Sequence, residues 1–319
     1  MTDLLQPAAS QAVPTDTQYW TDANSDRSEH NIKVQLQQWA KTSNDLRGFV
    51  LRRCDLSGID LSKTADHPQG YMLQGADLYR ANVANAHLFS ADLSGAVLMK
   101  ANFSGANLQS ANLENANLLG IKLEGAKLHN IHWGDRMVQE RQAIAEEKNG
   151  RRQHAAALYL EAEETYRNLR INLERSGLFE RAGDFFHREM VMRRKQMTAF
   201  SSQRTMSYLV DMFCGYGEKP LRVVLFSLAF IVFCAGCYYL TAGIIYQGQE
   251  LGLNIRLSLM ENLRHFMACL YFSVVTFTTL GYGDMTPVGA TRAIAAVEAF
   301  AGSFTMALYV VVFVKKMTR

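Results

Sequence analysis

An apolar residue recurs at every fifth position through much of the first half of the chain. The series is Leu73, Leu78, Val83, Leu88, Leu93, Leu98, Phe103, Leu108, Leu113, Leu118, Leu123 and Leu128. A small residue, almost always alanine, stands two positions before most of them, and the residue between is usually Asp or Asn. A helix would spread these positions around its circumference, and a strand would alternate them between two faces. The period therefore predicts neither a helix nor a flat sheet.

A square coil with four five-residue sides per turn explains the period. It places every central leucine inside and leaves room beside it for alanine. Stacked coils rise about 4.8 Å, which is the spacing of hydrogen-bonded strands. An earlier stretch keeps the same spacing at Leu46, Leu51, Leu56 and Leu61. Because Leu73 is out of register with Leu61, we expect residues 62–70 to bulge out as a loop.

The motif Ala-(Asp/Asn)-Leu-x-x resembles the pentapeptide-repeat family. This resemblance implies a right-handed quadrilateral β-helix over residues 44–133. Some members of the family resemble duplex DNA and bind topoisomerases, a role that requires an acidic surface. Residues 44–133 hold eight Asp or Glu and eight Lys or Arg. This balance disfavours DNA mimicry, and we expect no nucleic-acid partner. A rigid spacer, or a docking domain for an unknown cytoplasmic protein or ligand, is favoured.

The segments on either side of the repeat have different compositions. Residues 1–43 are rich in Gln, Thr, Ser, Asp and Asn, which predicts a mostly disordered tail. In residues 135–199, charged and apolar residues alternate at helical spacing, and Ser176-Gly177 interrupts them. The apolar stripe of the first predicted helix is Leu158, Ala162, Leu169 and Leu173.

The stretch after this interruption resembles the turn and second helix of a tetratricopeptide repeat, in a single copy. It reads Gly177-Leu-Phe-x-x-Ala182-x-x-Phe185. We therefore predict a cytoplasmic helical hairpin. The favoured interpretation is a connector that packs on the predicted β-helix (the rod) or on copies of itself in other chains. Peptide binding is the alternative.

Two long stretches in the last third of the chain are almost free of charge. Val223 to Gln249 carries no formally charged residue, and Ala293 to Val314 carries only Glu298. Each is long enough to cross a hydrocarbon core of about 30 Å at about 1.5 Å per residue. These stretches exclude a purely soluble protein and predict transmembrane helices at 221–246 and 292–316. Residues 200–220, apolar with sparse charge, are expected to form an interfacial helix on the lipid bilayer.

Basic residues flank both predicted spans. Lys219 and Arg222 lie at the start of the first, and Lys315, Lys316 and Arg319 follow the second. Because basic residues favour the cytoplasmic side, both termini are expected in the cytoplasm, with two crossings of the inner membrane of a bacterial-type cell.

A third apolar stretch, from His265 to Gly283, lies between the spans. A third crossing would leave one basic flank outside, so we predict a re-entrant pore helix at 263–279 and an extended loop at 279–284. The string Thr279-Leu-Gly-Tyr-Gly-Asp284 resembles the selectivity filter of the potassium-channel family. The order of outer helix, pore helix, filter and inner helix also resembles that family. The resemblance implies an all-α two-transmembrane pore.

The filter-like string is suited to binding a bare cation. Gly281 and Gly283 permit alternating backbone conformations, so the carbonyls of Thr279, Leu280, Gly281 and Tyr282 can point to one side. Four such strands around an axis replace the water shell of K⁺ with oxygens. Because each chain supplies one strand, we predict a homotetramer with K⁺ as the permeant ion and no cofactor.

Two further residues are candidates for supporting the filter. These are Asp284, which closes the string, and Glu298, the lone acid in a span. We hypothesise that Glu298 forms a hydrogen bond behind the filter. The aromatic pair of the pore helix is Tyr271-Phe272, where many members of the family carry two tryptophans, and Val275 stands where some members carry a carboxylate.

The second span contains the candidate gate. Gly302 occupies the hinge position of family inner helices, and glycine tolerates bending. Ser303, Met306, Val310 and Val314 share one helix face and are predicted to line the cavity. Val310 or Val314 would lie near the cytoplasmic constriction. The alternative is that this face packs on neighbouring helices.

These features predict a potassium-selective channel whose gating is coupled to the cytoplasmic repeat domain. One alternative is a filter that also passes sodium. Another is a membrane-tethered scaffold or topoisomerase-interacting protein with a degenerate or weakly selective pore. Enzymatic activity is not expected, because the sequence shows no Ser/His/Asp set, metal-spaced His cluster or Walker loop. His129 and His132 are expected on the surface.

Overall fold

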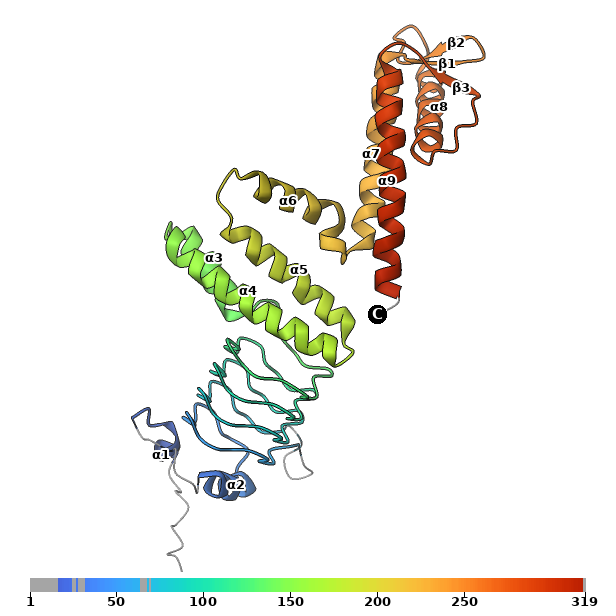
Figure 1. Cartoon of the computed structure of the whole chain (residues 1–319). Helices are drawn as coiled ribbons and strands as arrows, with labels where there is room; N and C mark the ends of the chain where they lie inside the picture. Colours follow the sequence, from blue (N-terminus) through green and yellow to red (C-terminus); the bar gives the residue numbers. More distant parts are fainter. Residues whose placement is uncertain (1–16, 25–26, 28–31, 64–67, 69, 318–319) are drawn as a thin grey trace, which may run out of the picture. The chain divides into compact units, whose positions relative to one another are not determined.

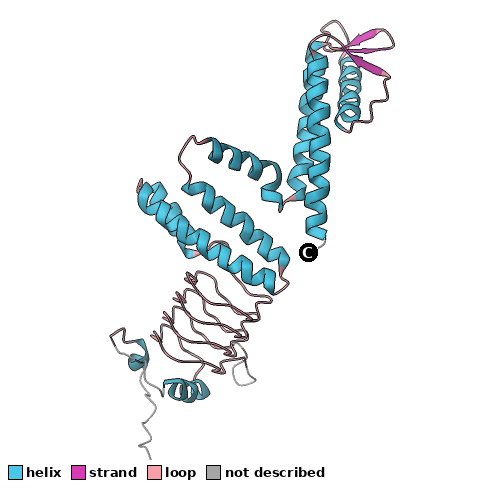
Figure 2. Cartoon of the chain, in the orientation of Figure 1, coloured by secondary structure: helices cyan, strands magenta, loops and turns pink. Residues whose placement is uncertain are grey.

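The computed structural model describes residues 17–24, 27, 32–63, 68 and 70–317 (Figure 1). The chain divides into two compact units, Met1–Thr198 and Ala199–Arg319. The repeat region is drawn as loops and turns, and most of the other elements of the chain are helices (Figure 2).

The repeat region of the first unit is a β-helix. Parallel bridges join residues that are 20 positions apart, such as Asn82 and Asn102. One coil therefore contains four five-residue sides. The corners lie every fifth residue in the left-handed region of backbone conformation, for example at Gly75 and Asn85 with φ of 67° and 56°. Glycine and asparagine tolerate this conformation best, which explains their frequency at the corners.

The interior of the β-helix is filled as the period predicts. Every residue of the series from Leu73 to Leu128 is at most 3% exposed, and the alanines two positions earlier are buried as well. Asp45 is bridged to Met72 across the predicted loop, which keeps the stacking in register. Within that loop, residues 64–67 and 69 lie outside the described part of the chain. The predicted β-helix is confirmed.

The segment before the rod is not a disordered tail where the structure describes it. Helix α1 spans Thr17–Thr21 and helix α2 spans Ile32–Thr42. Ile32, Leu36 and Ala40 are buried at helical spacing, and the ring of Trp20 stacks on Phe49 of the first coil at 5.2 Å. The prediction of disorder to residue 43 is wrong for these helices, because their apolar faces join the core of the rod. Residues 1–16, 25–26 and 28–31 lie outside the described part.

Three helices follow the rod: α3 Val138–Lys148, α4 Arg152–Arg175 and α5 Phe179–Gln196. The predicted hairpin corresponds to α4 and α5, and Gly177 adopts φ of 74° at the predicted break. Helix α3 was not predicted as a separate element. The predicted stripe omits Tyr166, which is fully buried and whose hydroxyl donates a hydrogen bond to Glu140 of α3.

The connector packs directly on the last coils of the rod. Asn168 Nδ2 donates to the carbonyl of Ile121 at 2.6 Å, and the rings of Trp133 and Phe185 form a T-shaped pair with 5.6 Å between their centroids. A single buried cluster extends from α2 through the rod into α4 and α5. These contacts support the connector interpretation over peptide binding.

The second unit contains the predicted membrane segments. Its elements are α6 Ser202–Cys214, a 3-10 turn Gly215–Gly217, α7 Pro220–Thr241, β1 Ile244–Tyr246, β2 Gln249–Leu251, α8 Leu259–Phe277, β3 Met285–Pro287 and α9 Thr291–Met317. Among the described residues, two helices, α7 and α9, are long and apolar enough to cross a membrane. Helix α8 packs against both (Figure 1).

The first predicted span extends too far. Helix α7 ends at Thr241, and Ala242 takes a left-handed φ of 48°. The chain then forms β1, the central strand of an antiparallel sheet with order β2-β1-β3, in which Ile244 pairs with Leu251 and Pro287. The hydropathy of residues 242–246 reflects a strand whose Ile244 is buried in the core of the second unit, and not continuation of the helix.

Candidate functional site

The loop Thr278–Asp284 joins the end of α8 to β3. Its backbone takes positive φ at Thr279 (56°), Gly281 (55°) and Gly283 (76°), whereas Leu280 and Tyr282 between them do not. The alternation that the two glycines predict is therefore present, and it includes Thr279. This conformation is strained for a β-branched residue such as Thr279, and backbone strain of this kind is concentrated at functional sites.

The last turn of α8 holds the start of the loop. Leu280 N donates to the carbonyl of Val275 at 3.0 Å, and Thr279 N donates to that of Thr276 at 3.0 Å. The other end of α8 is fixed by a capping box between Ser258 and Glu261. With both ends fixed, the carbonyl end of the α8 dipole points toward the start of the loop, where it favours a cation.

The loop side chains are exposed in the single chain. Leu280 and Tyr282 are 60% and 67% exposed. Large exposed apolar side chains of this kind mark an interaction surface. On α8, Tyr271 interacts with Asp284 of the loop, and the ring of buried Phe272 lies nearly perpendicular to that of Tyr238, with 5.1 Å between the centroids.

Glu298 is fully buried where α7, α8 and α9 meet. The hydroxyl of Tyr238 on α7 donates to its Oε2 at 2.6 Å, and the hydroxyl of Ser273 on α8 donates to its Oε1. The carboxylate thus joins all three helices. Its predicted support for the filter would act through α8, since these partners lie on α7 and α8 and not on the loop.

We expect Glu298→Gln to lower the stability of the purified protein. The two hydroxyls donate to different carboxylate oxygens, and an amide replaces one of these acceptors with a donor. An amide nitrogen that faces Tyr238 leaves this buried hydroxyl without its acceptor, at a cost of about 1–3 kcal/mol, whereas Ser273 keeps the Ile231 carbonyl, 2.9 Å away, as a second acceptor. Thermal unfolding in detergent measures the loss. Tyr238→Phe, which removes a donor and leaves Ser273 in place, is expected to cost less. Equal melting temperatures for wild type and Glu298→Gln would contradict the prediction.

Gly302 has a packing role that sequence reasoning missed. A Cβ at this position would lie 1.9 Å from the carbonyl oxygen of Phe277, at the end of α8. Only glycine allows α9 to approach the last turn of α8 this closely. Helix α9 is a single helix through this position, and the predicted hinge stays a prediction.

The predicted cavity-lining residues are exposed on α9. Ser303, Met306, Val310 and Val314 all lie on the surface of the single chain, whereas Gly302, Thr305 and Val312 are buried. Phe304 and Val311 are also exposed, so the uncovered surface of α9 is wider than the predicted lining face. This surface is large enough to contact neighbouring subunits as well as a cavity.

Two ion pairs near the basic ends of α7 and α9 had no signal in the sequence. Lys315 Nζ lies 2.5 Å from Glu218 Oε1, and Arg222 Nη1 lies 2.9 Å from Asp211 Oδ1. The partners of the first pair are 97 residues apart. Only the fold brings them together.

Two families match separate parts of the chain. Residues 224–319 match the ion channel family, and residues 73–105 and 101–131 match pentapeptide repeats in eight copies. No curated protein matches the chain significantly.

The solved structures similar to this chain include pentapeptide repeat proteins. The protein alr5209 from Nostoc PCC 7120 is 30% identical, with 33% of this chain and 85% of that chain covered and a TM-score of 0.22. HetL, involved in heterocyst differentiation regulation in Nostoc sp. strain PCC 7120, is 32% identical, with 28% and 50% covered and a TM-score of 0.19. AT2G44920 from the Arabidopsis thaliana thylakoid lumen is 25% identical, with 33% and 71% covered and a TM-score of 0.14.

Proposed function

We propose that this chain, parts of which match the ion channel family and pentapeptide repeats, forms a homotetrameric, potassium-selective channel. The observation that carries the proposal is the alternating backbone at Thr279, Gly281 and Gly283. Ion channel domains work as oligomers in a membrane. In a tetramer, four copies of this loop would surround one axis and offer K⁺ rings of carbonyl oxygens.

The exposed surfaces of the second unit support this assembly. Leu280 and Tyr282 in the loop are largely exposed in the single chain, and neighbouring copies of the loop around one axis would cover them. Helices α7 and α9 would cross the inner membrane of the cell, with both chain termini in the cytoplasm because basic residues lie at both ends.

Potassium flux tests the proposed function. Purified full-length protein in K⁺-loaded liposomes is expected to release K⁺ when a proton ionophore balances the charge. Protein-free liposomes are the control. Flux no faster than in the control would overturn the proposal and leave a membrane-tethered scaffold as the remaining function.

We also propose that the repeat domain controls gating through the segment before α7. The rod and connector share one core up to α5, and the chain then enters α6. The Asp211–Arg222 pair joins α6 to α7, and the Glu218–Lys315 pair joins the segment before α7 to the end of α9. A displacement of α6 would therefore be transmitted to the cytoplasmic end of the inner helix.

The Glu218–Lys315 pair is expected to favour the closed channel. It joins the segment before α7 to the end of α9, which is one continuous helix, and an outward displacement of that end would separate Lys315 from Glu218. An ion pair with one partly exposed partner contributes about 0.5 kcal/mol, so four copies shift the closed–open equilibrium roughly thirtyfold. Lys315→Gln should raise the open probability of single channels in bilayers.

Lys316→Gln is the matched control. Lys316 is the next residue of α9 and is exposed, so the substitution removes the same charge from the same helical turn. It should leave the open probability near that of wild type. The double exchange Glu218→Lys with Lys315→Glu should restore it. If the two lysine variants behaved alike, the ion pair would have no role in gating.

A further inference from the structure

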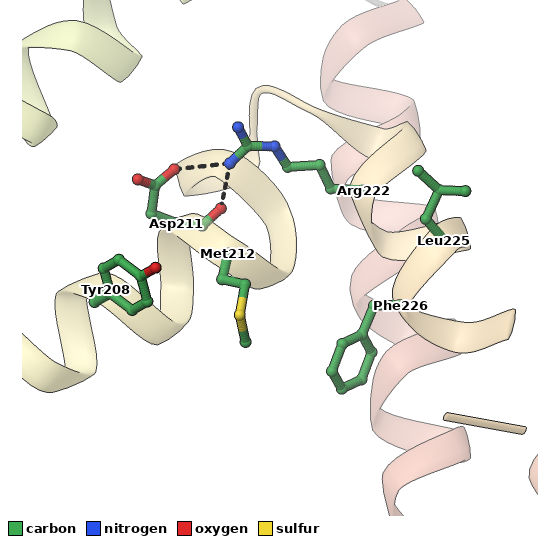
Figure 3. A pocket seen from close by; sticks show the side chains of 6 residues that line it. All are labelled: Tyr208, Asp211, Met212, Arg222, Leu225 and Phe226. Carbon is green, nitrogen blue, oxygen red and sulfur yellow. Dashed lines mark hydrogen bonds and ion pairs between the residues drawn. The ribbon is translucent and has the colours of Figure 1, made fainter. Parts of the chain in front are cut away.

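A cavity of about 540 Å³ opens between α6 and the start of α7 (Figure 3). The residues that line it are Tyr208, Asp211, Met212, Arg222, Leu225 and Phe226. Gly215 ends α6 in a left-handed conformation with φ of 55°, which turns the chain toward α7. The cavity lies in the corner that this turn creates.

One end of the cavity carries a positive and a negative charge side by side. Arg222 Nη1 donates to Asp211 Oδ1 at 2.9 Å and to the Asp211 carbonyl at 2.6 Å. The arginine side chain is 37% exposed. A guanidinium has five N–H donors in a planar fork, so Arg222 can bind a phosphate and keep Asp211.

The rest of the wall is apolar. Leu225 and Met212 are 58% and 52% exposed, and Met212 and Phe226 lie on the same side of the Arg222–Asp211 pair (Figure 3). Leu225 and Phe226 follow Arg222 by about 5 Å along the helix axis.

The position of the cavity along α7 is that of a membrane surface. No formal charge follows Arg222 until Glu250. The charged end therefore lies where the span leaves the hydrocarbon, and the apolar wall lies inside it. A molecule that is charged at this depth and apolar just below it is a phospholipid.

We propose that this cavity binds a phospholipid with a primary ammonium headgroup, such as phosphatidylethanolamine. Arg222 would bind the phosphate, Asp211 would accept hydrogen bonds from the ammonium, and Leu225, Phe226 and Met212 would contact an acyl chain. The Arg222–Asp211 pair has no net charge, which favours a zwitterionic lipid over an anionic one. The site requires that α7 span the membrane, but it does not require ion conduction.

Native mass spectrometry of the purified full-length protein tests the proposal. Phosphatidylethanolamine, phosphatidylcholine and phosphatidylglycerol with identical acyl chains are added in turn after delipidation in detergent. Phosphatidylethanolamine should bind about tenfold more tightly than the other two, because choline has no N–H to donate and glycerol has no positive charge. Equal affinities, a preference for phosphatidylglycerol, or no retained lipid would each overturn the proposal. This series uses the wild-type protein and does not depend on the folding of a variant.

Substitutions then locate the site. Arg222→Gln should lower the affinity for phosphatidylethanolamine about tenfold. Asp211→Asn should abolish the preference over phosphatidylcholine. Arg204→Gln, a change on α6 outside the cavity, should alter neither. If Arg222→Gln weakened subunit assembly and left lipid affinity unchanged, a neighbouring subunit would occupy the cavity instead.

Discussion

Gly281→Ala is expected to abolish potassium flux while the protein still assembles and enters the membrane. Gly281 has φ of 55°, and an L-residue in this region costs about 1–2 kcal/mol. Among the described residues, no atom lies within 4 Å of a Cβ built at this position, so the penalty comes from the backbone and not from a clash. The loop relieves it by rotating the peptide, which turns a carbonyl away from the ion path.

The effect should be large because each of four strands carries the change. Four penalties together amount to about 4–8 kcal/mol, and a fall in flux of more than a hundredfold is expected. Liposome flux at equal protein density measures it, and size-exclusion chromatography verifies assembly.

Gly289→Ala is the matched control for this experiment. Gly289 has φ of 60°, and again no atom of the described residues lies within 4 Å of a built Cβ, but it lies in the turn before α9, outside the filter. The two variants carry the same backbone strain at different places. If they conducted equally well, the loop at Thr279–Gly283 would not be the selectivity filter.

Gly302→Ala is expected to prevent assembly of a stable channel. The new methyl group would lie 1.9 Å from the Phe277 carbonyl oxygen, so α9 or the last turn of α8 must move. That turn holds Leu280 through the Val275 carbonyl, and its displacement would loosen the start of the filter in every subunit. Overpacking of this kind costs about 1–3 kcal/mol per site. The oligomeric fraction and the melting temperature in detergent should both fall.

Gly236→Ala in α7 separates this packing effect from the general effect of alanine in a helix. Within the part of the chain that the structure describes, nothing lies within 4 Å of a Cβ at Gly236, so alanine there should stabilise the helix by about 0.5–1 kcal/mol. A hinge role for Gly302 predicts something different, namely normal assembly with a lower open probability. A normal oligomeric fraction for Gly302→Ala would show that the packing role is wrong.

The sequence was sufficient where a local period determines the fold. A side-chain period of five allows only a coil with five-residue sides, and the buried series from Leu73 to Leu128 follows it. The apolar length of Thr291–Met317 likewise predicted α9 to within one residue at each end. The glycines at 281 and 283 predicted the alternating backbone of the loop.

The sequence was insufficient where burial comes from distant partners. The composition before residue 44 resembles that of disordered chains, but α2 is stabilised by the core of the rod, which no local window contains. The position at which α7 ends depends on the pairing of β1 with β3. The Glu218–Lys315 ion pair depends on α9 packing beside α7. The glycine at position 302 is visible in the sequence, but the requirement for glycine there comes from the carbonyl of Phe277, which lies on another helix.

The central claim is potassium selectivity, and the reversal potential under bi-ionic conditions tests it most directly. Wild-type protein is placed in a planar bilayer with KCl on one side and an equal concentration of NaCl on the other. A carbonyl-lined filter should pass K⁺ at least tenfold more readily than Na⁺, which shifts the reversal potential by about 59 mV or more toward the potassium equilibrium potential. A reversal potential at zero would mean equal permeabilities and would contradict the claim.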